Sequence, residues 1–133
     1  MRSNHRTTLL LFLLASIIST SFHYTDNATF IDNYPEPDWI TVSGIYITWI
    51  VMTIIGIVGY WLYTQEKLGL SYLCLCIYSV TGLSSPAHYF YGVMSNFSTK
   101  MHTLIWLDLL TGAFVLGFVI WSGLLLREWQ PKD

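Results

Sequence analysis

Three histidines and one aspartate are the side chains of this sequence best suited to chemistry. They stand within apolar stretches or at their ends: His23, His88, His102 and Asp108. Imidazole nitrogens and carboxylate oxygens are ligands that proteins offer to zinc, copper and iron, and four-helix bundles hold such metals between facing helices. The pattern therefore predicts a site for one of these transition metals. Haem fits less well, because nothing requires His88 and His102 to lie on opposite sides of one ring plane.

Asp26 follows His23 by three residues, which is close to one helical turn. A carboxylate at this spacing is expected to orient the imidazole of His23 or to join it as an extra metal ligand. The alternative is ordinary chemistry at a helix end, in which His23 is solvated and Asp26 closes a turn.

His88 follows Ser84, Ser85 and Pro86 inside the third apolar stretch. Pro86 has no backbone N–H to donate, so it is expected to kink a helix at this point. A histidine beside a kink and two serines indicates the wall of a polar pocket. The alternative is helix packing, in which the serines bond to the backbone and His88 bonds to a neighbouring helix.

Asp108 is the strongest single candidate for a site residue. An unpaired carboxylate at the centre of a membrane-spanning helix costs about 2.5 to 3.5 kcal/mol. Asp108 is expected to face the bundle and to be neutralised by His88, His23, Lys100 or its own proton. His102 stands six residues earlier, so the two side chains point about 120° apart. They reach one centre only if His102 leans inward, and a solvated His102 at the membrane surface is the alternative.

The composition places these residues in a membrane protein. Hydrophobic residues make up 53% of the 133 residues, charged residues 11%, and the mean hydropathy is +0.50. We expect one all-α transmembrane domain over residues 1–133, a bundle of four helices at about 7–21, 39–63, 68–93 and 99–126. The first stretch also fits a signal peptide. Cys74 and Cys76 point to different sides of a helix, so neither a disulfide nor a thiolate metal site is expected.

Basic residues predict the orientation, because they are retained on the cytoplasmic side. Five of the six fall on one side of the predicted bundle: Arg2, Arg6, Lys67, Arg127 and Lys132. Both termini are therefore expected in the cytoplasm, and the site on the extracytoplasmic side. The outer loop at 22–38 alternates proline with polar residues near its end, so it should be stiff and fold over the bundle mouth, with Asp38 capping the second helix.

Three functional hypotheses follow. The first is a small metal-binding membrane protein or metalloenzyme; the sequence does not decide between the two. The second is a carrier, or a proton or cation pathway, with Asp108 and His88 as a relay; no ionisable residue is expected to continue that path through the inner half.

The third hypothesis is an accessory or assembly subunit of a larger membrane complex. Small residues permit close helix contacts with other subunits or a second copy: Gly56, Gly59 and the pair Ala113 and Gly117. Any compact bundle needs the same residues. The expected surroundings are the lipid bilayer, and no nucleic-acid partner is expected.

Overall fold

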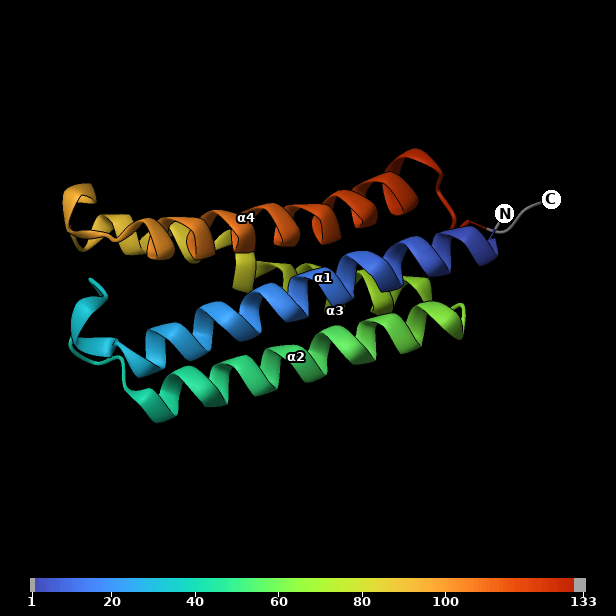
Figure 1. Cartoon of the computed structure of the whole chain (residues 1–133). Helices are drawn as coiled ribbons and strands as arrows, with labels where there is room; N and C mark the ends of the chain where they lie inside the picture. The colour runs from blue at the N-terminus through green and yellow to red at the C-terminus, as the bar shows by residue number, and fades with distance from the viewer. Residues whose placement is uncertain (1, 131–133) are drawn as a thin grey trace.

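The computed structural model describes residues 2–130, which form an antiparallel bundle of four long helices (Figure 1). These are α1 (Arg2–Thr29), α2 (Val42–Thr64), α3 (Leu68–Leu83) and α4 (Thr99–Ile120). The shorter elements are the 3-10 helices η1 (Ile31–Asn33), η2 (Ser85–Phe90) and η3 (Met94–Asn96), and the π-helix η4 (Trp121–Leu125). The described part of the chain contains no strand. Met1 and residues 131–133, including Lys132, lie outside the described residues.

Four segments are long and apolar enough to cross a membrane: Ser3–Thr29, Val42–Thr64, Leu68–Phe90 and Thr99–Leu125. Their outward faces carry large apolar side chains that are more than half exposed, such as Ile47, Ile54 and Leu70. Such a surface suits hydrocarbon as a solvent rather than water. The prediction of an all-helical chain with four apolar helices of spanning length is confirmed.

The helix bounds differ most from the predicted ones in the first and third helices. The first helix was expected over 7–21 and runs from Arg2 to Thr29, because buried partners satisfy its later polar side chains, among them His23 and Asn27. The third was expected over 68–93 and ends at Leu83. Pro86 therefore does not kink a continuing α-helix, since the chain proceeds as the 3-10 helix η2 with Pro86 in its first turn.

The connection between α1 and α2 also differs from its prediction. It covers residues 30–41 rather than 22–38. Thr41, not Asp38, is the N-cap of α2, and its side-chain oxygen accepts a hydrogen bond from the backbone N–H of Gly44 at 3.1 Å.

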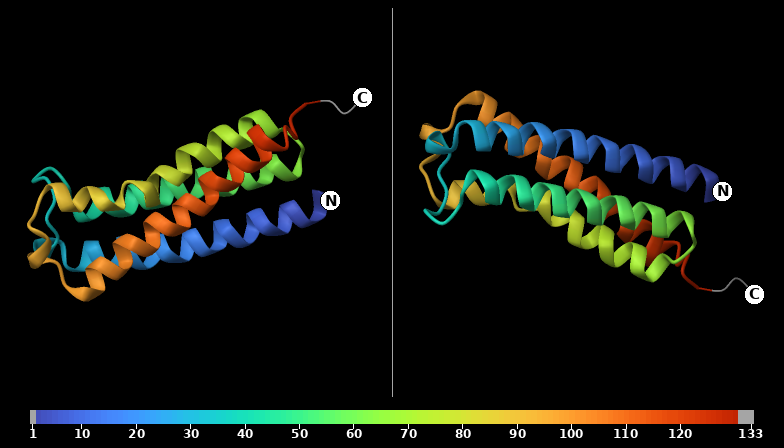
Figure 2. Two further views of the ribbon diagram at one scale, coloured as in Figure 1. Left: turned by 90° about the horizontal axis from the view of Figure 1, so that it is seen from above. Right: turned by 90° about the horizontal axis from the view of Figure 1, so that it is seen from below.

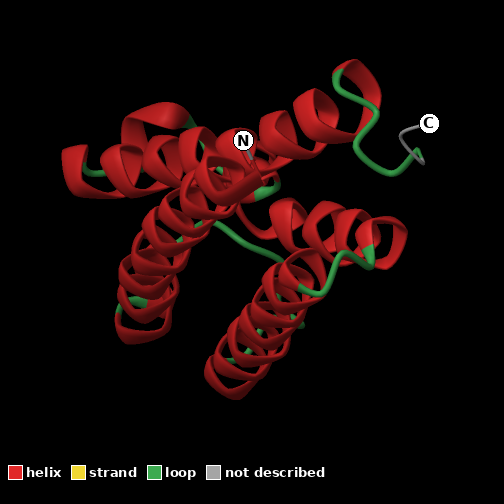
Figure 3. Ribbon diagram, turned by 90° about the vertical axis from the view of Figure 1, so that its right-hand side faces the viewer, coloured by secondary structure: helices red, strands yellow, loops and turns green. Residues whose placement is uncertain are grey.

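The helices follow one another round the bundle in sequence order. α1 and α3 each pack against both α2 and α4, and they touch each other only slightly. The views in Figure 2 and Figure 3 show α4 lying obliquely across its neighbours. The start of α1, the α2–α3 turn and the end of η4 lie together at what we call the terminal end; segments 30–41 and 91–98 form the opposite, loop end (Figure 1).

Two glycines bring α3 and α4 into close contact near the middle of the bundle. A Cβ atom on Gly82 would lie 2.2 Å from the backbone oxygen of Asp108, and one on Gly112 would lie 3.0 Å from the Cα of Gly82. Only residues without a side chain permit this approach. The close crossing sets Asp108 against the end of α3, where Ser85 follows.

Candidate functional site

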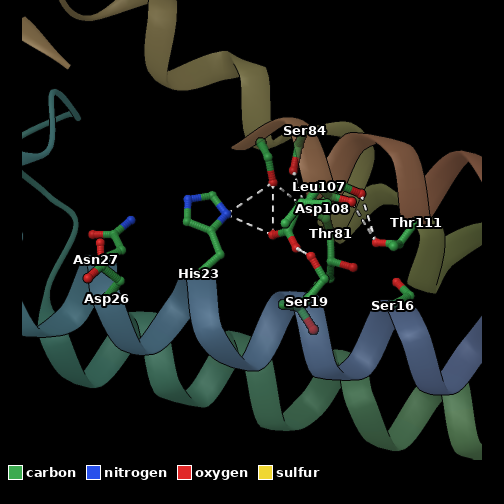
Figure 4. A network of polar contacts seen from close by, with 12 residues as sticks. Ser16, Ser19, His23, Asp26, Asn27, Thr81, Ser84, Leu107, Asp108 and Thr111 are labelled. Atoms are coloured by element: carbon green, nitrogen blue, oxygen red, sulfur yellow. Dashed lines mark hydrogen bonds and ion pairs between the residues drawn. The ribbon is translucent and has the colours of Figure 1, made fainter. Parts of the chain in front are cut away.

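A buried carboxylate lies at the centre of the candidate site. Asp108 is 0% exposed and His23 is 2% exposed. The Oδ2 atom of Asp108 lies 2.7 Å from Nδ1 of His23 and accepts a hydrogen bond from the hydroxyl of Ser85 at 3.2 Å. Ser19 donates to the other carboxylate oxygen (Figure 4). The prediction that Asp108 faces the bundle with a partner is confirmed, and His23 is that partner.

Three elements supply this arrangement. Ser19 and His23 stand four residues apart on α1, so both face α4 and Asp108. Ser85 comes from η2, just after α3 ends. The three donors satisfy the carboxylate, which would otherwise be an unpaired charge in an apolar interior.

The contact with Asp108 also decides what the other nitrogen of His23 can do. With Asp108 ionised and the His23 ring neutral, Nδ1 of His23 carries the proton and donates it, and Nε2 is then a hydrogen-bond acceptor. Figure 4 shows one ring nitrogen turned to Asp108 and the other turned away from it. Nε2 is buried and has no hydrogen-bond partner within residues 2–130. The pair therefore presents an oriented acceptor to whatever lies beside it.

A cavity of about 270 Å³ lies beside His23 at the loop end. It is enclosed by α1, the start of α2, the end of α3 with η2, and the 30–41 connection. Its wall includes His23, Asn27, Glu36, Trp39, Thr48 and His88. The expectations that the outer loop folds over the bundle mouth and that His88 forms part of a polar pocket wall are both confirmed.

Three residues of this wall each carry a buried polar atom that has no hydrogen-bond partner among the described residues. These atoms are Nε2 of His23, Oδ1 of Asn27 and Oε1 of Glu36. The second oxygen of Glu36 accepts a hydrogen bond from the Asn27 amide at 3.2 Å. Burial raises the pKa of Glu36, although the hydrogen bond from Asn27 acts against that rise. Each unpartnered buried atom costs about 1 to 3 kcal/mol, which a ligand with complementary groups would recover.

His88 lies beside His23 on the cavity wall, with the two ring centroids 5.5 Å apart. Its Nδ1 atom lies 3.2 Å from the carbonyl oxygen of Pro35 and donates to it. This bond fastens the 30–41 connection to η2. His88 therefore holds the covering segment as well as forming part of the wall.

Two of the predicted site residues lie elsewhere. Asp26 accepts a hydrogen bond from the Tyr34 hydroxyl at 2.7 Å and forms an ion pair with Lys100 at 2.6 Å. It does not orient His23, because Asp108 makes that contact. The Nδ1 atom of His102 bonds to the hydroxyl of Tyr89 at 2.7 Å and does not lean towards Asp108.

The predicted metal site gains no support from this geometry. Residues 2–130 contain no group of three or more histidine, cysteine, aspartate and glutamate side chains that could hold a metal ion. The Nδ1 atoms of His23, His88 and His102 are each committed to a different partner. Binding of zinc, copper, iron or haem therefore remains a prediction.

A second buried polar cluster lies at the terminal end and was not anticipated from the sequence. One oxygen of Glu128 accepts hydrogen bonds from Tyr63 at 2.7 Å and Ser122 at 2.6 Å, and the other pairs with His5. Burial alone would raise the pKa of Glu128, but the bonds from Ser122, Tyr63 and His5 lower it below the usual range. His5 and Glu128 are thus ionisable residues at the terminal end, whereas the expectation that no ionisable residue continues a path from Asp108 through the inner half stays a prediction.

The local backbone explains why this cluster was missed. The π-helix η4 and the positive φ of 49° at Arg127 turn the chain back, so Glu128 enters the bundle instead of following α4 outward. One available signal was the spacing of His5 and His23, because 18 residues make five full helical turns and place both side chains on one face of α1. Asn27 and Glu36 carried no comparable signal.

Comparisons of this chain with protein-family models, curated proteins and solved structures each found no match. The functional argument therefore stands on the geometry of the described residues.

Proposed function

We propose that this chain is a multi-pass membrane protein that binds a small molecule in the cavity at the loop end. His23, held by Asp108, is its central recognition group. One observation carries the proposal: His23 lines a cavity of about 270 Å³, is oriented by Asp108, and has a buried Nε2 atom with no partner in the described part of the chain. Small-molecule sites combine a mostly apolar wall with a few convergent polar groups of this kind.

The proposed orientation places this cavity on the extracytoplasmic side and both termini in the cytoplasm. Arg6, Lys67 and Arg127 stand at the terminal end, whereas Lys100 stands at the loop end, where it is paired with Asp26. The excess of basic residues at the terminal end supports this orientation.

Proton conduction is a second candidate, favoured by the buried His5 and Glu128 at the terminal end. The core between the two polar clusters argues against it. Leu9, Leu13 and Leu75 are at most 2% exposed and fill much of this core, where the hydroxyl of Tyr78 is already bonded to Ser16 at 3.1 Å. We therefore place binding ahead of conduction.

The test is the small-molecule content of the purified protein. Native mass spectrometry from a mild detergent, followed by solvent extraction, would compare wild type with His23→Ala. A bound molecule is expected in wild type and is expected to be lost from the variant. His102→Ala is the matched control, because His102 bonds to Tyr89 outside this cavity. Equal content in wild type and His23→Ala would contradict the proposal.

A further inference from the structure

We infer that the ligand of this cavity carries a primary ammonium group, which Glu36, Asn27 and His23 receive together. The inference rests on the proposed binding function and gives it a substrate class. The three atoms without a partner among the described residues are Nε2 of His23, Oδ1 of Asn27 and Oε1 of Glu36. Each of them is an acceptor, so the ligand must be a donor.

The hydrogen bonds around these atoms define that acceptor character for a neutral His23 beside an ionised Asp108. In this state Nδ1 of His23 donates to Asp108, which makes Nε2 the acceptor of the ring. The amide nitrogen of Asn27 donates to Glu36, which leaves Oδ1 as an acceptor. Oε1 of an ionised Glu36 accepts only. An ammonium group has three N–H donors and no acceptor, so it matches this set.

Charge favours a cation over a neutral donor. Glu36 is the only aspartate, glutamate, lysine or arginine among the described residues that line the cavity. Lys100, the basic residue of the loop end, is committed to Asp26 at 2.6 Å and to the ring of Phe30 at 4.1 Å. A cation therefore meets a compensating carboxylate, whereas a carboxylate ligand would face Glu36 without a basic partner.

The remainder of the wall suits the apolar part of such a ligand. Ile40 and Ile45 contribute apolar surface, and Tyr24 and Trp39 contribute aromatic rings. Aromatic faces also attract ammonium groups. An amine with a small apolar or aromatic body is thus complementary to both parts of the cavity.

Three probes that share a phenylethyl body test the inference: 2-phenylethylammonium, 2-phenylethanol and 3-phenylpropanoate. Isothermal titration calorimetry would use the full chain in detergent at mildly alkaline pH, with heats into empty micelles subtracted. The ammonium is expected to bind most tightly and the carboxylate not to bind. Glu36→Gln is expected to weaken ammonium binding by about tenfold or more and to leave the alcohol nearly unchanged.

Asp32→Asn is the matched control, because it makes the same charge change on an exposed residue of the same connection. It should leave the ammonium affinity unchanged. The inference is overturned if the ammonium does not bind, if the carboxylate binds as tightly, or if Glu36→Gln has no more effect than Asp32→Asn. A further outcome is that the alcohol binds as tightly as the ammonium and that His23→Ala abolishes its binding. This result would overturn the inference of an ammonium ligand but would retain the proposed binding function.

The ammonium can come from a free amine or from an ethanolamine lipid headgroup. Repeating the titration in nanodiscs of phosphatidylglycerol, with and without phosphatidylethanolamine, separates these sources. A lipid source predicts that phosphatidylethanolamine weakens the binding of 2-phenylethylammonium by competition. A free amine predicts equal binding in both membranes.

Discussion

The Nδ1 atom of His23 lies 2.7 Å from the Oδ2 atom of Asp108, although 85 residues separate the two in the chain. The contact joins α1 to α4 in the half of the bundle that contains the cavity. It gives the buried carboxylate a hydrogen-bond partner. It also fixes the orientation of Nε2 of His23, which is an acceptor when the ring is neutral. One pair thus serves both the stability of the bundle and the binding site.

Removing the carboxylate should therefore destabilise the protein. Asp108→Ala leaves His23, Ser19 and Ser85 without their common acceptor, and breaking a buried pair costs about 3 to 5 kcal/mol. Thermal unfolding in detergent measures the effect. Asp32→Ala, at an exposed acid, should unfold close to the wild-type temperature. Equal unfolding temperatures for the two variants would refute the structural role of Asp108.

The close crossing of α3 and α4 predicts that adding one methyl group at Gly82 lowers the stability of the protein. Gly82→Ala places a Cβ atom 2.2 Å from the backbone oxygen of Asp108, so the helices must separate, at a cost of about 1 to 3 kcal/mol. Gly69→Ala is the control on the same helix, where a Cβ meets nothing within 4 Å. If Gly82→Ala is as stable as Gly69→Ala, the close approach is not needed for stability.

Glu36 is expected to cost stability when no ligand is bound. Burial raises its pKa, so the folded protein holds the proton more tightly than the unfolded chain does. Its contribution is fully present below the ordinary glutamate pKa and is lost as the pH rises through the raised value. Glu36→Gln should therefore match wild type in acid and unfold a few degrees higher at neutral pH, as measured by thermal unfolding across pH. A lower unfolding temperature at neutral pH would contradict this.

Glu128 predicts the opposite pH dependence at the terminal end. Its pKa is lowered in the folded protein by bonds from Ser122, Tyr63 and His5, so its contribution is present above the ordinary glutamate pKa and is lost as the pH falls through the lowered value. Glu128→Gln should unfold below wild type at neutral pH, and the gap should narrow in acid. Glu66→Gln, an exposed glutamate at the same end, should show a smaller gap. A gap that stays constant with pH would argue against this role.

Metal content separates the metal hypothesis from the binding site proposed above. Inductively coupled plasma mass spectrometry would compare wild type with the His88→Ala/Asp108→Ala double variant. The small-molecule site proposed above requires no metal, and the described residues offer no three-ligand group, so this proposal predicts zinc, copper and iron well below one ion per chain in both proteins. Near-stoichiometric metal in wild type that the double variant lacks would restore the metal hypothesis.

Composition and periodicity were sufficient to predict the class of this protein. A bilayer requires about 20 apolar residues for each span, and this constraint can be read along the chain without any knowledge of contacts. The same constraint predicts that Asp108 needs a buried partner, because a charge in an apolar medium is costly wherever the helices pack. The position of Pro86 indicated a break in the third span, although the break ends the α-helix rather than kinking it.

Only the tertiary structure determined which polar side chains contact one another. Four candidates could neutralise Asp108, and the rotation of α1 against α4 selects His23, while Tyr89 engages His102 and Lys100 engages Asp26. The 30–41 connection brings Glu36 to the cavity, and η4 turns Glu128 back into the bundle. These contacts depend on helix rotation and on the paths of irregular segments. Sequence spacing within one helix cannot specify either quantity, because both are determined by packing between helices.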